Sequence, residues 1–245
     1  MIKTLLAFGL TVLVMLIFTP LGLITFILSF LGLRKPVSWF IYKIAQGWAQ
    51  IVILITGCTM EVKGREHIPL RGGVCFVSNH VGLFDIILTL AYAGRPFGFI
   101  AKKELLFLPV FNLWIYILGG LFIDRGNIRN AMKTINHGID RIQKGGSMLI
   151  FPEGTRNKGL GLLPFKSGAI KLATHSLATI VPIAITGSYE VFEKNKRVIG
   201  VPLRIVFCPP IITGEMSSDE RRHRLTDQVR STIEEALQTS IPQQE

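Results

Sequence analysis

Several features that define large classes of proteins are missing from this sequence. The three cysteines, Cys58, Cys75 and Cys208, are far apart and show no C-x-x-C spacing, so neither a zinc site nor a disulfide framework is predicted. We interpret them as small buried hydrophobic residues in a reducing compartment. A G-x-x-x-x-G-K-[ST] phosphate loop is absent, and so is the G-x-S-x-G nucleophile elbow of a serine hydrolase. No cofactor is expected.

Charge is missing from the first part of the chain. Residues 4–33 contain no charged side chain, and Arg34-Lys35 ends the run. As one helix this run would be about 45 Å long, against about 30 Å of bilayer hydrocarbon. Pro20 lies in its middle and should kink or break the helix. The run therefore predicts either a tilted single span or a helical hairpin within one leaflet. A signal peptide would be shorter and would end in a small-residue cleavage site, which we do not find.

A second apolar stretch, 37–56, carries a polar stripe at helical spacing, formed by Lys43, Gln46 and Gln50. It also contains aromatic residues of the kind that favour a membrane interface: Trp39, Phe40, Tyr42 and Trp48. We predict a second helix that lies near the membrane surface. Arg34-Lys35 between the helices indicates a cytoplasmic connection by the positive-inside rule. This places the protein at the cytoplasmic face of the cell inner membrane or plasma membrane.

Acidic residues are scarce, with 16 against 27 basic residues and a net charge of +11. This balance favours an anionic partner, either nucleic acid or a lipid surface. The apolar N-terminus favours lipid, because basic residues near a membrane gain about 1 kcal/mol each from anionic headgroups. Nucleic-acid binding would require basic residues interleaved with exposed aromatics, and no such stretch occurs. We predict an anionic membrane surface as a partner and no nucleic acid.

Beyond residue 56 the chain alternates strand-like and helical stretches. The predicted strands are short, rich in Val, Ile and Phe, and bounded by Gly or Pro: 60–63, 73–78, 97–101, 121–124, 148–151, 180–186 and 203–207. The predicted helices are 83–93, 108–118, 128–144, 167–175 and 217–238, the last opened by the capping box Ser217-x-x-Glu220. This alternation predicts an α/β domain over 57–245, with a mostly parallel central sheet flanked by helices. A two-helix membrane-associating segment over 1–56 precedes it.

The stretch 79–85 reads N-H-V-G-L-F-D and directly follows a predicted strand. In such folds ligands sit in loops at the carboxyl ends of strands. Asp85 could fix the tautomer of His80, whose other ring nitrogen would then remove a proton from a hydroxyl. Positions five apart differ by about 140° on a helix, so the pair needs a turn before the helix, which Gly82 could supply. The pattern alone fits equally well a structural role for His80 at the helix start.

Cations and a further carboxylate follow other predicted strands. In the stretch F-P-E-G-T-R, Glu153 and Arg156 flank a Gly-Thr turn, and the Arg side chain matches a phosphate bidentately. Arg125 follows another strand and could add a second phosphate donor. For Lys102 and Lys103 spacing alone favours a solvated face. Each feature also fits an ordinary surface turn or ion pair, but together they indicate acyl or phosphoryl chemistry on a phosphate-bearing substrate.

In this order, the stretches resemble the motifs of the glycerolipid acyltransferases, most closely the bacterial lysophosphatidic acid acyltransferases. That family has N-H-x-x-x-x-D, a glycine-led stretch ending in Arg, F-P-E-G-[TS]-R, and a hydrophobic strand containing Pro. The corresponding stretches here are 79–85, 120–125, 151–156 and 181–185, and the similarity covers about residues 57–210. Positions 81 and 82 depart from the family's usual polar pair, such as Gln-Ser.

The resemblance implies that His80 is the general base and that Asp85 is its partner. It also implies a substrate-binding set: Lys102, Lys103, Arg125, Glu153, Gly154, Thr155 and Arg156. Within that set the two arginines would bind the acceptor's phosphate, the Glu-Gly-Thr stretch would shape that site, and one lysine would lie near the reacting centre. Lys166 could meet the phosphate of the acyl donor.

The reaction implied is direct transfer of a fatty acyl group from an acyl thioester, on CoA or acyl carrier protein, to lysophosphatidic acid. The product would be phosphatidic acid, formed without a covalent acyl-enzyme. Rival hypotheses are the same chemistry on glycerol 3-phosphate, a lyso-ornithine lipid or another lysophospholipid, and a non-catalytic lipid-binding protein. A metal-dependent hydrolase is a third rival, but the other histidines show no ligand spacing with His80: His67, His137, His175 and His223. No metal site is predicted.

Overall fold

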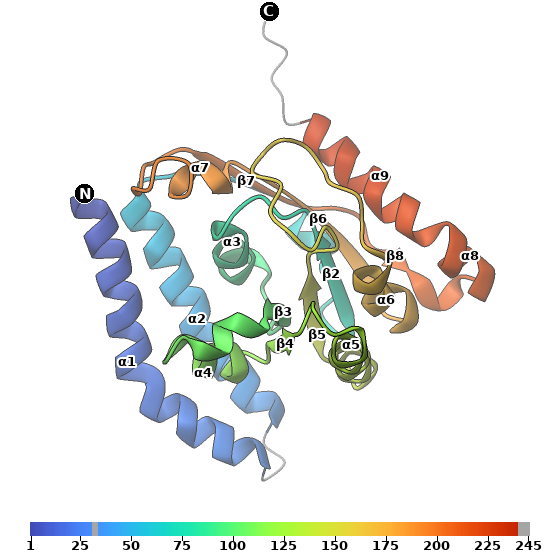
Figure 1. Ribbon diagram of the computed structural model, residues 1–245, viewed down its shortest axis with the longest axis horizontal. Helices are drawn as coiled ribbons and strands as arrows, with labels where there is room; N and C mark the ends of the chain where they lie inside the picture. The colour runs from blue at the N-terminus through green and yellow to red at the C-terminus, as the bar shows by residue number, and fades with distance from the viewer. Residues whose placement is uncertain (31–33, 240–245) are drawn as a thin grey trace, which may run out of the picture.

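The N-terminal segment is a pair of long helices that run in opposite directions (Figure 1). The computed structural model describes residues 1–30 and 34–239, so the end of the uncharged run, at 31–33, lies outside the described residues. Helix α1 (Ile2–Phe30) continues through Pro20, and helix α2 (Arg34–Thr56) packs against it. Figure 1 shows α1 bent but unbroken, as expected where proline removes one helical hydrogen bond. The uncharged run thus forms one helix with a kink and no hairpin of its own, and the hairpin in the structure is made by α1 and α2 together.

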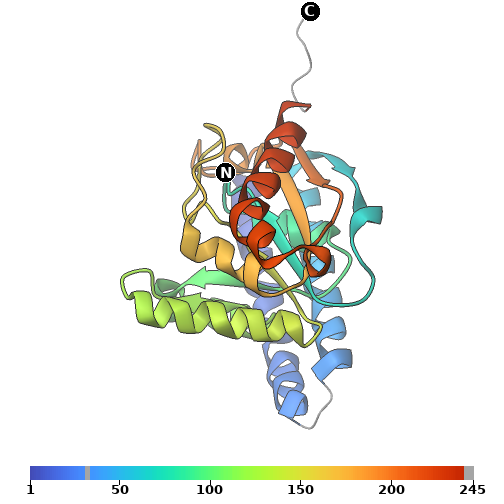
Figure 2. The ribbon, with the colours of Figure 1, turned by 90° about the vertical axis from the view of Figure 1, so that its right-hand side faces the viewer.

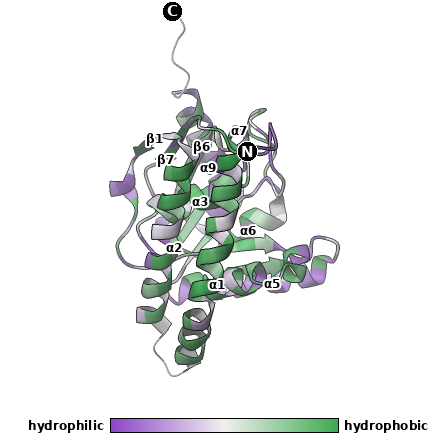
Figure 3. Ribbon diagram, turned by 90° about the vertical axis from the view of Figure 1, so that its left-hand side faces the viewer, coloured by the Kyte–Doolittle hydropathy of each residue, from purple (hydrophilic) through white to green (hydrophobic). Residues whose placement is uncertain are grey.

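Both helices contain a window long and apolar enough to cross a membrane, Ile2–Ile24 in α1 and Pro36–Thr56 in α2. Only 11% of the first window is buried, against 39% of the second. Figure 3 shows hydrophobic residues along most of α1. A continuous exposed apolar surface of this extent is typical of membrane contact, so the N-terminal helices suggest membrane association.

Two of the three residues of the polar stripe on α2 contact the rest of the protein, whereas the third, Lys43, is exposed. Gln46 and Gln50 donate from Nε2 to the carbonyl oxygen of Ala91, at 3.1 and 3.4 Å. This oxygen lies near the end of helix α3 (Phe84–Tyr92), where the last carbonyls of a helix lack an intrahelical partner. The two glutamines therefore hold α2 on α3.

One of the aromatic residues assigned to the membrane interface is likewise part of the core. Tyr42 is 1% exposed, and its hydroxyl donates to the carbonyl oxygen of Leu90 at 3.1 Å. Trp39 and Phe40, by contrast, are exposed. The outward side of α2 thus carries aromatic residues together with Lys43, and its inward side carries the hydrogen bonds to α3.

The central sheet has eight strands within the described residues, and it is mostly parallel, as predicted. The strands are β1 (Thr59–Lys63), β2 (Val74–Ser78), β3 (Gly98–Lys102), β4 (Leu121–Ile123), β5 (Ser147–Ile150), β6 (Thr179–Thr186), β7 (Pro202–Phe207) and β8 (Ile211–Ile212). Their order across the sheet is β1-β7-β6-β2-β5-β3-β4, with β8 paired to β6. Only the β6–β7 and β6–β8 pairs are antiparallel. The carboxyl ends of β2, β3, β4 and β5 therefore share one edge of the sheet.

Helices cover both faces of the sheet. Phe76 of β2 points into the core shared with α2 and α3, and Cys75 of the same strand points into the core shared with α5 (Ile128–Gln143), α6 (Ser167–His175) and α9 (Leu225–Gln238). Figure 2 shows the last three helices together on one side. Successive side chains of a strand alternate between faces, so this central strand is buried on both.

Cys75 and Cys208 are buried and free, as predicted for two of the cysteines.

The predicted helix over 217–238 is two helices, α8 (Ser218–His223) and α9. The capping box of Ser217 and Glu220 is present and opens α8. Apolar residues at helical spacing begin only at Leu225, so only α9 has a face to bury, and the chain turns between the two. Helix α7 (Ser188–Val191) and strand β8 were not predicted, because elements this short show no periodicity.

We expect Tyr42→Phe to lower the free energy of unfolding by about 1–2 kcal/mol, because the carbonyl of Leu90 loses a buried hydrogen-bond donor. Thermal or denaturant unfolding in detergent measures this loss. The control is Trp39→Phe on the exposed side of α2, for which we expect a change within about 0.5 kcal/mol. Equal losses in the two variants would contradict the packing described for α2.

Candidate active site

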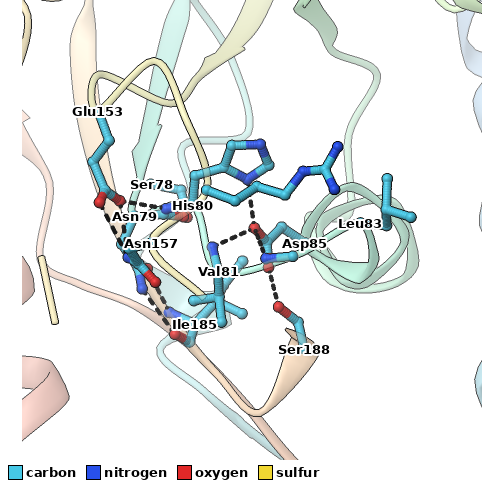
Figure 4. Close-up of polar contacts among 12 residues, drawn as sticks. Ser78, Asn79, His80, Val81, Leu83, Asp85, Glu153, Asn157, Ile185 and Ser188 are labelled. Atoms are coloured by element: carbon cyan, nitrogen blue, oxygen red, sulfur yellow. Dashed lines mark hydrogen bonds and ion pairs between the residues drawn. The ribbon is translucent and has the colours of Figure 1, made fainter. Parts of the chain in front are cut away.

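The side chains of His80 and Asp85 meet in the loop between β2 and α3, at the carboxyl edge of the sheet (Figure 4). Nδ1 of His80 lies 2.7 Å from Oδ2 of Asp85. Helix α3 begins only at Phe84, so the histidine precedes the helix and the chain turns back to bring the two side chains together. The predicted contact is present, with the turn that the five-residue spacing requires.

Asp85 is fully buried and accepts hydrogen bonds from donors on two segments of the chain. Its Oδ2 accepts from the backbone N–H groups of Val81 and Gly82 at 2.7 and 3.0 Å, in addition to His80. Its Oδ1 accepts from the hydroxyl of Ser188, at the start of α7. A buried carboxylate is tolerated where such donors replace water. The loop is therefore folded around this carboxylate.

Gly82 is required by close packing. Its φ is not in the left-handed region. A Cβ at this position would lie 2.9 Å from the backbone N and Cα of Tyr189 and 2.6 Å from Oε2 of Glu193. We expected glycine here because its backbone freedom would allow a turn. The structure instead shows a steric requirement, because α7 packs directly on the loop.

The loop after β5 contacts both the ring and the backbone of His80. The ring of Phe151 stacks on the imidazole, with 4.1 Å between centroids and 19° between planes. Glu153 is 1% exposed and accepts from the backbone N–H of His80 at 2.6 Å. Its two oxygens also accept from Asn157 Nδ2, at 3.1 Å each, and from the N–H of Leu163 at 2.8 Å. Burial raises the pKa of the Glu153 carboxyl, and these donors oppose that rise.

Asn79 ties the same loop to the neighbouring strand β6. Its Nδ2 donates to the carbonyl oxygen of Ile185 at 2.9 Å, and its Oδ1 accepts from the N–H of Ile185 at 2.8 Å. Asn79 is 1% exposed, so both bonds are shielded from water. Together with Glu153, it fixes the backbone at His80 and directly before it.

The two arginines of the predicted phosphate site lie at the ends of this loop system. Arg156 pairs with Glu193, whose Oε2 accepts from the N–H of Leu83 at 2.6 Å. Arg125 donates to the carbonyl oxygen of Gly154, and Thr155 is exposed beside it. The side chain of Lys166 lies against Gly154, because a Cβ there would be 2.9 Å from its Cδ. The side chains of Arg125 and Lys166 thus both contact Gly154.

Lys102 and Lys103 lie at the end of β3, on the same edge of the sheet. Lys103 forms an ion pair with Asp124 at 2.9 Å, and this hydrogen bond raises the pKa of Lys103 and lowers that of Asp124. Lys102 is exposed.

Among residues 1–30 and 34–239, no group of three or more His, Cys, Asp and Glu side chains is placed to hold a metal ion.

A sequence model of the acyltransferase family matches residues 59–186, a range that contains the His80–Asp85 loop and the loop after β5. The chain belongs to the acyltransferase family. It is 30% identical over 191 residues to the 1-acyl-sn-glycerol-3-phosphate acyltransferase of Borreliella burgdorferi, covering 78% of this chain and 76% of that one. It is 33% identical over 172 residues to the protein of the same name from Limnanthes douglasii, and this match spans 69% of the chain but only 60% of the plant protein.

A solved structure has a similar fold over nearly the whole length. The crystal structure of the 1-acyl-sn-glycerophosphate (LPA) acyltransferase PlsC from Thermotoga maritima superposes with a TM-score of 0.78, covering 97% of this chain and 96% of that one. The two sequences are 24% identical. This similarity establishes the fold, including the helices at the N-terminus.

Three residues of this acyltransferase site were not found from sequence: Ser188, Glu193 and Asn157. Ser188 and Glu193 lie in and after α7, more than a hundred residues beyond the loop that they contact. No spacing pattern connects positions so far apart. Asn157 directly follows the F-P-E-G-T-R stretch, and its amide next to a buried glutamate was a signal that could have been used.

We expect Glu153→Gln to destabilise the acyltransferase by about 1–3 kcal/mol and to lower kcat, because both oxygens of Glu153 accept from N–H donors and an amide nitrogen would face one of them. Thermal unfolding and steady-state kinetics measure the two effects. Glu190→Gln, at an exposed carboxylate that pairs with Lys194, is the control. Unchanged stability and kcat in Glu153→Gln would show that these bonds do not hold His80.

Proposed function

We propose that this acyltransferase transfers a fatty acyl group from an acyl thioester to the sn-2 hydroxyl of 1-acylglycerol 3-phosphate, forming phosphatidic acid. The names of the relatives from Borreliella burgdorferi and Limnanthes douglasii support this acceptor. The observation that carries the proposal is the contact between His80 Nδ1 and the buried carboxylate of Asp85.

That contact determines which ring nitrogen can act as a base. An ionised carboxylate only accepts hydrogen bonds, so Nδ1 of His80 carries the proton and Nε2 presents a lone pair. The imidazole is 17% exposed, whereas the side chain of Asp85 has no exposure. Of the two side chains, a substrate can therefore reach only the histidine. Phe151 and Asp85 hold the ring in one orientation. The pair is thus arranged as a base and its positioning group.

In the proposed reaction, Nε2 of His80 takes the proton of the sn-2 hydroxyl as its oxygen attacks the thioester carbonyl. The new C–O ester bond forms, the C–S bond breaks, and the thiolate leaves with the proton that the imidazolium returns. Asp85 stabilises the imidazolium between the two transfers. No covalent acyl-enzyme is needed, because the acceptor hydroxyl is itself the nucleophile.

The cations at the same edge of the sheet support a phosphate-bearing acceptor. Arg125 and Arg156 supply the guanidinium groups proposed to bind its phosphate, and Gly154 and Thr155 form the turn between them. Glu153 contributes by shape and bracing, since its carboxylate is occupied by protein donors. One of the two lysines at the end of β3, Lys102 or Lys103, would lie near the reacting groups.

The acyl donor is proposed to be acyl-CoA or acyl carrier protein, and the reaction to take place at the cytoplasmic face of an anionic membrane. The apolar hairpin and the net charge of +11 support the membrane setting. An assay of the purified protein with lysophosphatidic acid and both thioesters, over several chain lengths, identifies the donor.

We expect His80→Ala to reduce kcat by about 10²–10⁴-fold or more, because general-base catalysis is removed, while the protein still folds and binds vesicles. Product formation from lysophosphatidic acid measures the loss. The matched control is His175→Ala, at an exposed histidine at the end of α6, for which we expect full activity. Near-normal turnover of His80→Ala would refute the mechanism.

We expect Arg156→Ala to raise the KM for lysophosphatidic acid by about 10- to 100-fold, the loss of a charge-assisted hydrogen bond of about 1.5–3 kcal/mol. The KM for the acyl thioester should change little. Lys194→Gln removes an exposed positive charge on the neighbouring segment and is the control. An unchanged dependence on acceptor concentration in Arg156→Ala would argue against its phosphate role.

A further inference from the structure

An exposed apolar surface lies between the end of β3 and the start of β4. It is formed by the 3-10 helix η2 (Lys103–Phe107), helix α4 (Phe111–Ile117) and the residues between them. We call it the η2–α4 surface and define it by its exposed apolar side chains: Leu106, Phe107, Leu108, Phe111 and Tyr116. Phe107 is 82% exposed, the largest value among the described phenylalanines. Large apolar side chains gathered in this way on the outside of a protein mark a contact surface.

This surface is joined to α1 by specific contacts. Nε1 of Trp114, in α4, donates to the carbonyl oxygen of Met15 at 3.1 Å and to the hydroxyl of Thr19 at 3.3 Å. A Cβ at Gly22 of α1 would lie 2.6 Å from Cδ1 of Ile117. Figure 1 shows α4 beside the bend of α1. The η2–α4 surface therefore lies next to the exposed apolar side of α1 and is packed against that helix.

We propose that the η2–α4 surface enters a phospholipid bilayer together with α1, as a membrane-contacting element of the catalytic domain itself. The occupant follows from its neighbour: the side chains of α1 that are exposed next to this surface are aliphatic over several turns, among them Leu16, Ile17 and Leu23. Lipid hydrocarbon is the partner that covers both at once.

The charges at the border of the surface agree with this partner. Lys102 is exposed directly before it, and η2 itself begins with Lys103, which pairs with Asp124, and Glu104. Lysines with long side chains can reach anionic headgroups while adjacent aromatic rings enter the hydrocarbon. The arrangement of aromatic residues next to cations is that of an interfacial membrane segment.

The position of the surface also relates it to the catalytic loop. Helix η2 directly follows β3, and the carboxyl end of β3 lies on the same edge of the sheet as that of β2, from which His80 extends. The surface would thus fix this edge relative to the bilayer.

The test is a depth measurement by spin labelling of the full chain in vesicles of phosphatidylglycerol and phosphatidylethanolamine. Phe107→Cys and, as a second site, Phe111→Cys are labelled with a nitroxide in a Cys58→Ala background. Cys75 and Cys208 are buried, and burial raises the pKa of both thiols, which slows their labelling. Leu70→Cys is the matched control: Leu70 is 94% exposed and precedes β2, at the opposite edge of the sheet.

We expect the ratio of collisions with oxygen to collisions with a water-soluble nickel complex to be several-fold higher at 107 and 111 than at 70. Equal ratios at all three positions would overturn the proposal. Spin–spin broadening at 107 would also overturn it, because a second copy of the chain would then cover the surface. The measurement requires no acyl transfer, so its outcome is separate from that of the proposed function.

Discussion

The buried carboxylate of Asp85 is the constraint around which the functional part of the fold is arranged. An ion removed from water costs several kcal/mol unless donors surround it. Here the donors come from the chain just before it, His80 to Gly82, and from Ser188 on a segment more than a hundred residues later. The loop must turn back so that its backbone N–H groups reach the carboxylate. Strand β6 must end where α7, which follows it, places Ser188 against Asp85. The orientation of the imidazole follows from satisfying this charge.

The membrane-associating hairpin and the α/β domain share one core. Tyr42, Ala49 and Val52 of α2 lie in the same hydrophobic cluster as Phe76 of the central strand. Helix α2 also binds the end of α3 through Gln46, and α3 carries Asp85 in its first turn. Packing and hydrogen bonds therefore connect the hairpin to the loop that holds His80. The division of the chain at residue 56 stays a prediction, because packing does not mark a boundary there.

Local sequence signals predicted much of this structure, and the failures share a cause. The seven longer strands and the parallel sheet followed from short apolar stretches, and the His80–Asp85 contact from its position after a strand. The contacts of Gln46 and Gln50 with α3 were not predicted, because periodicity shows that a helix has two sides but not what each side contacts. Glu193 was missed for a similar reason: its partners, Leu83 and Arg156, are brought to it only by the path of β6. Long-range packing decides such contacts.

The chemistry of the proposed acceptor agrees with the short connection between the proposed base and the proposed phosphate donors. In 1-acylglycerol 3-phosphate the reacting hydroxyl and the phosphate are on adjacent carbons, so the groups that serve them must lie close together. Glu153 accepts from the backbone of His80, and the next residue, Gly154, accepts from Arg125. Consecutive Cα atoms are about 3.8 Å apart, so one peptide unit separates the support of the base from that of the cation.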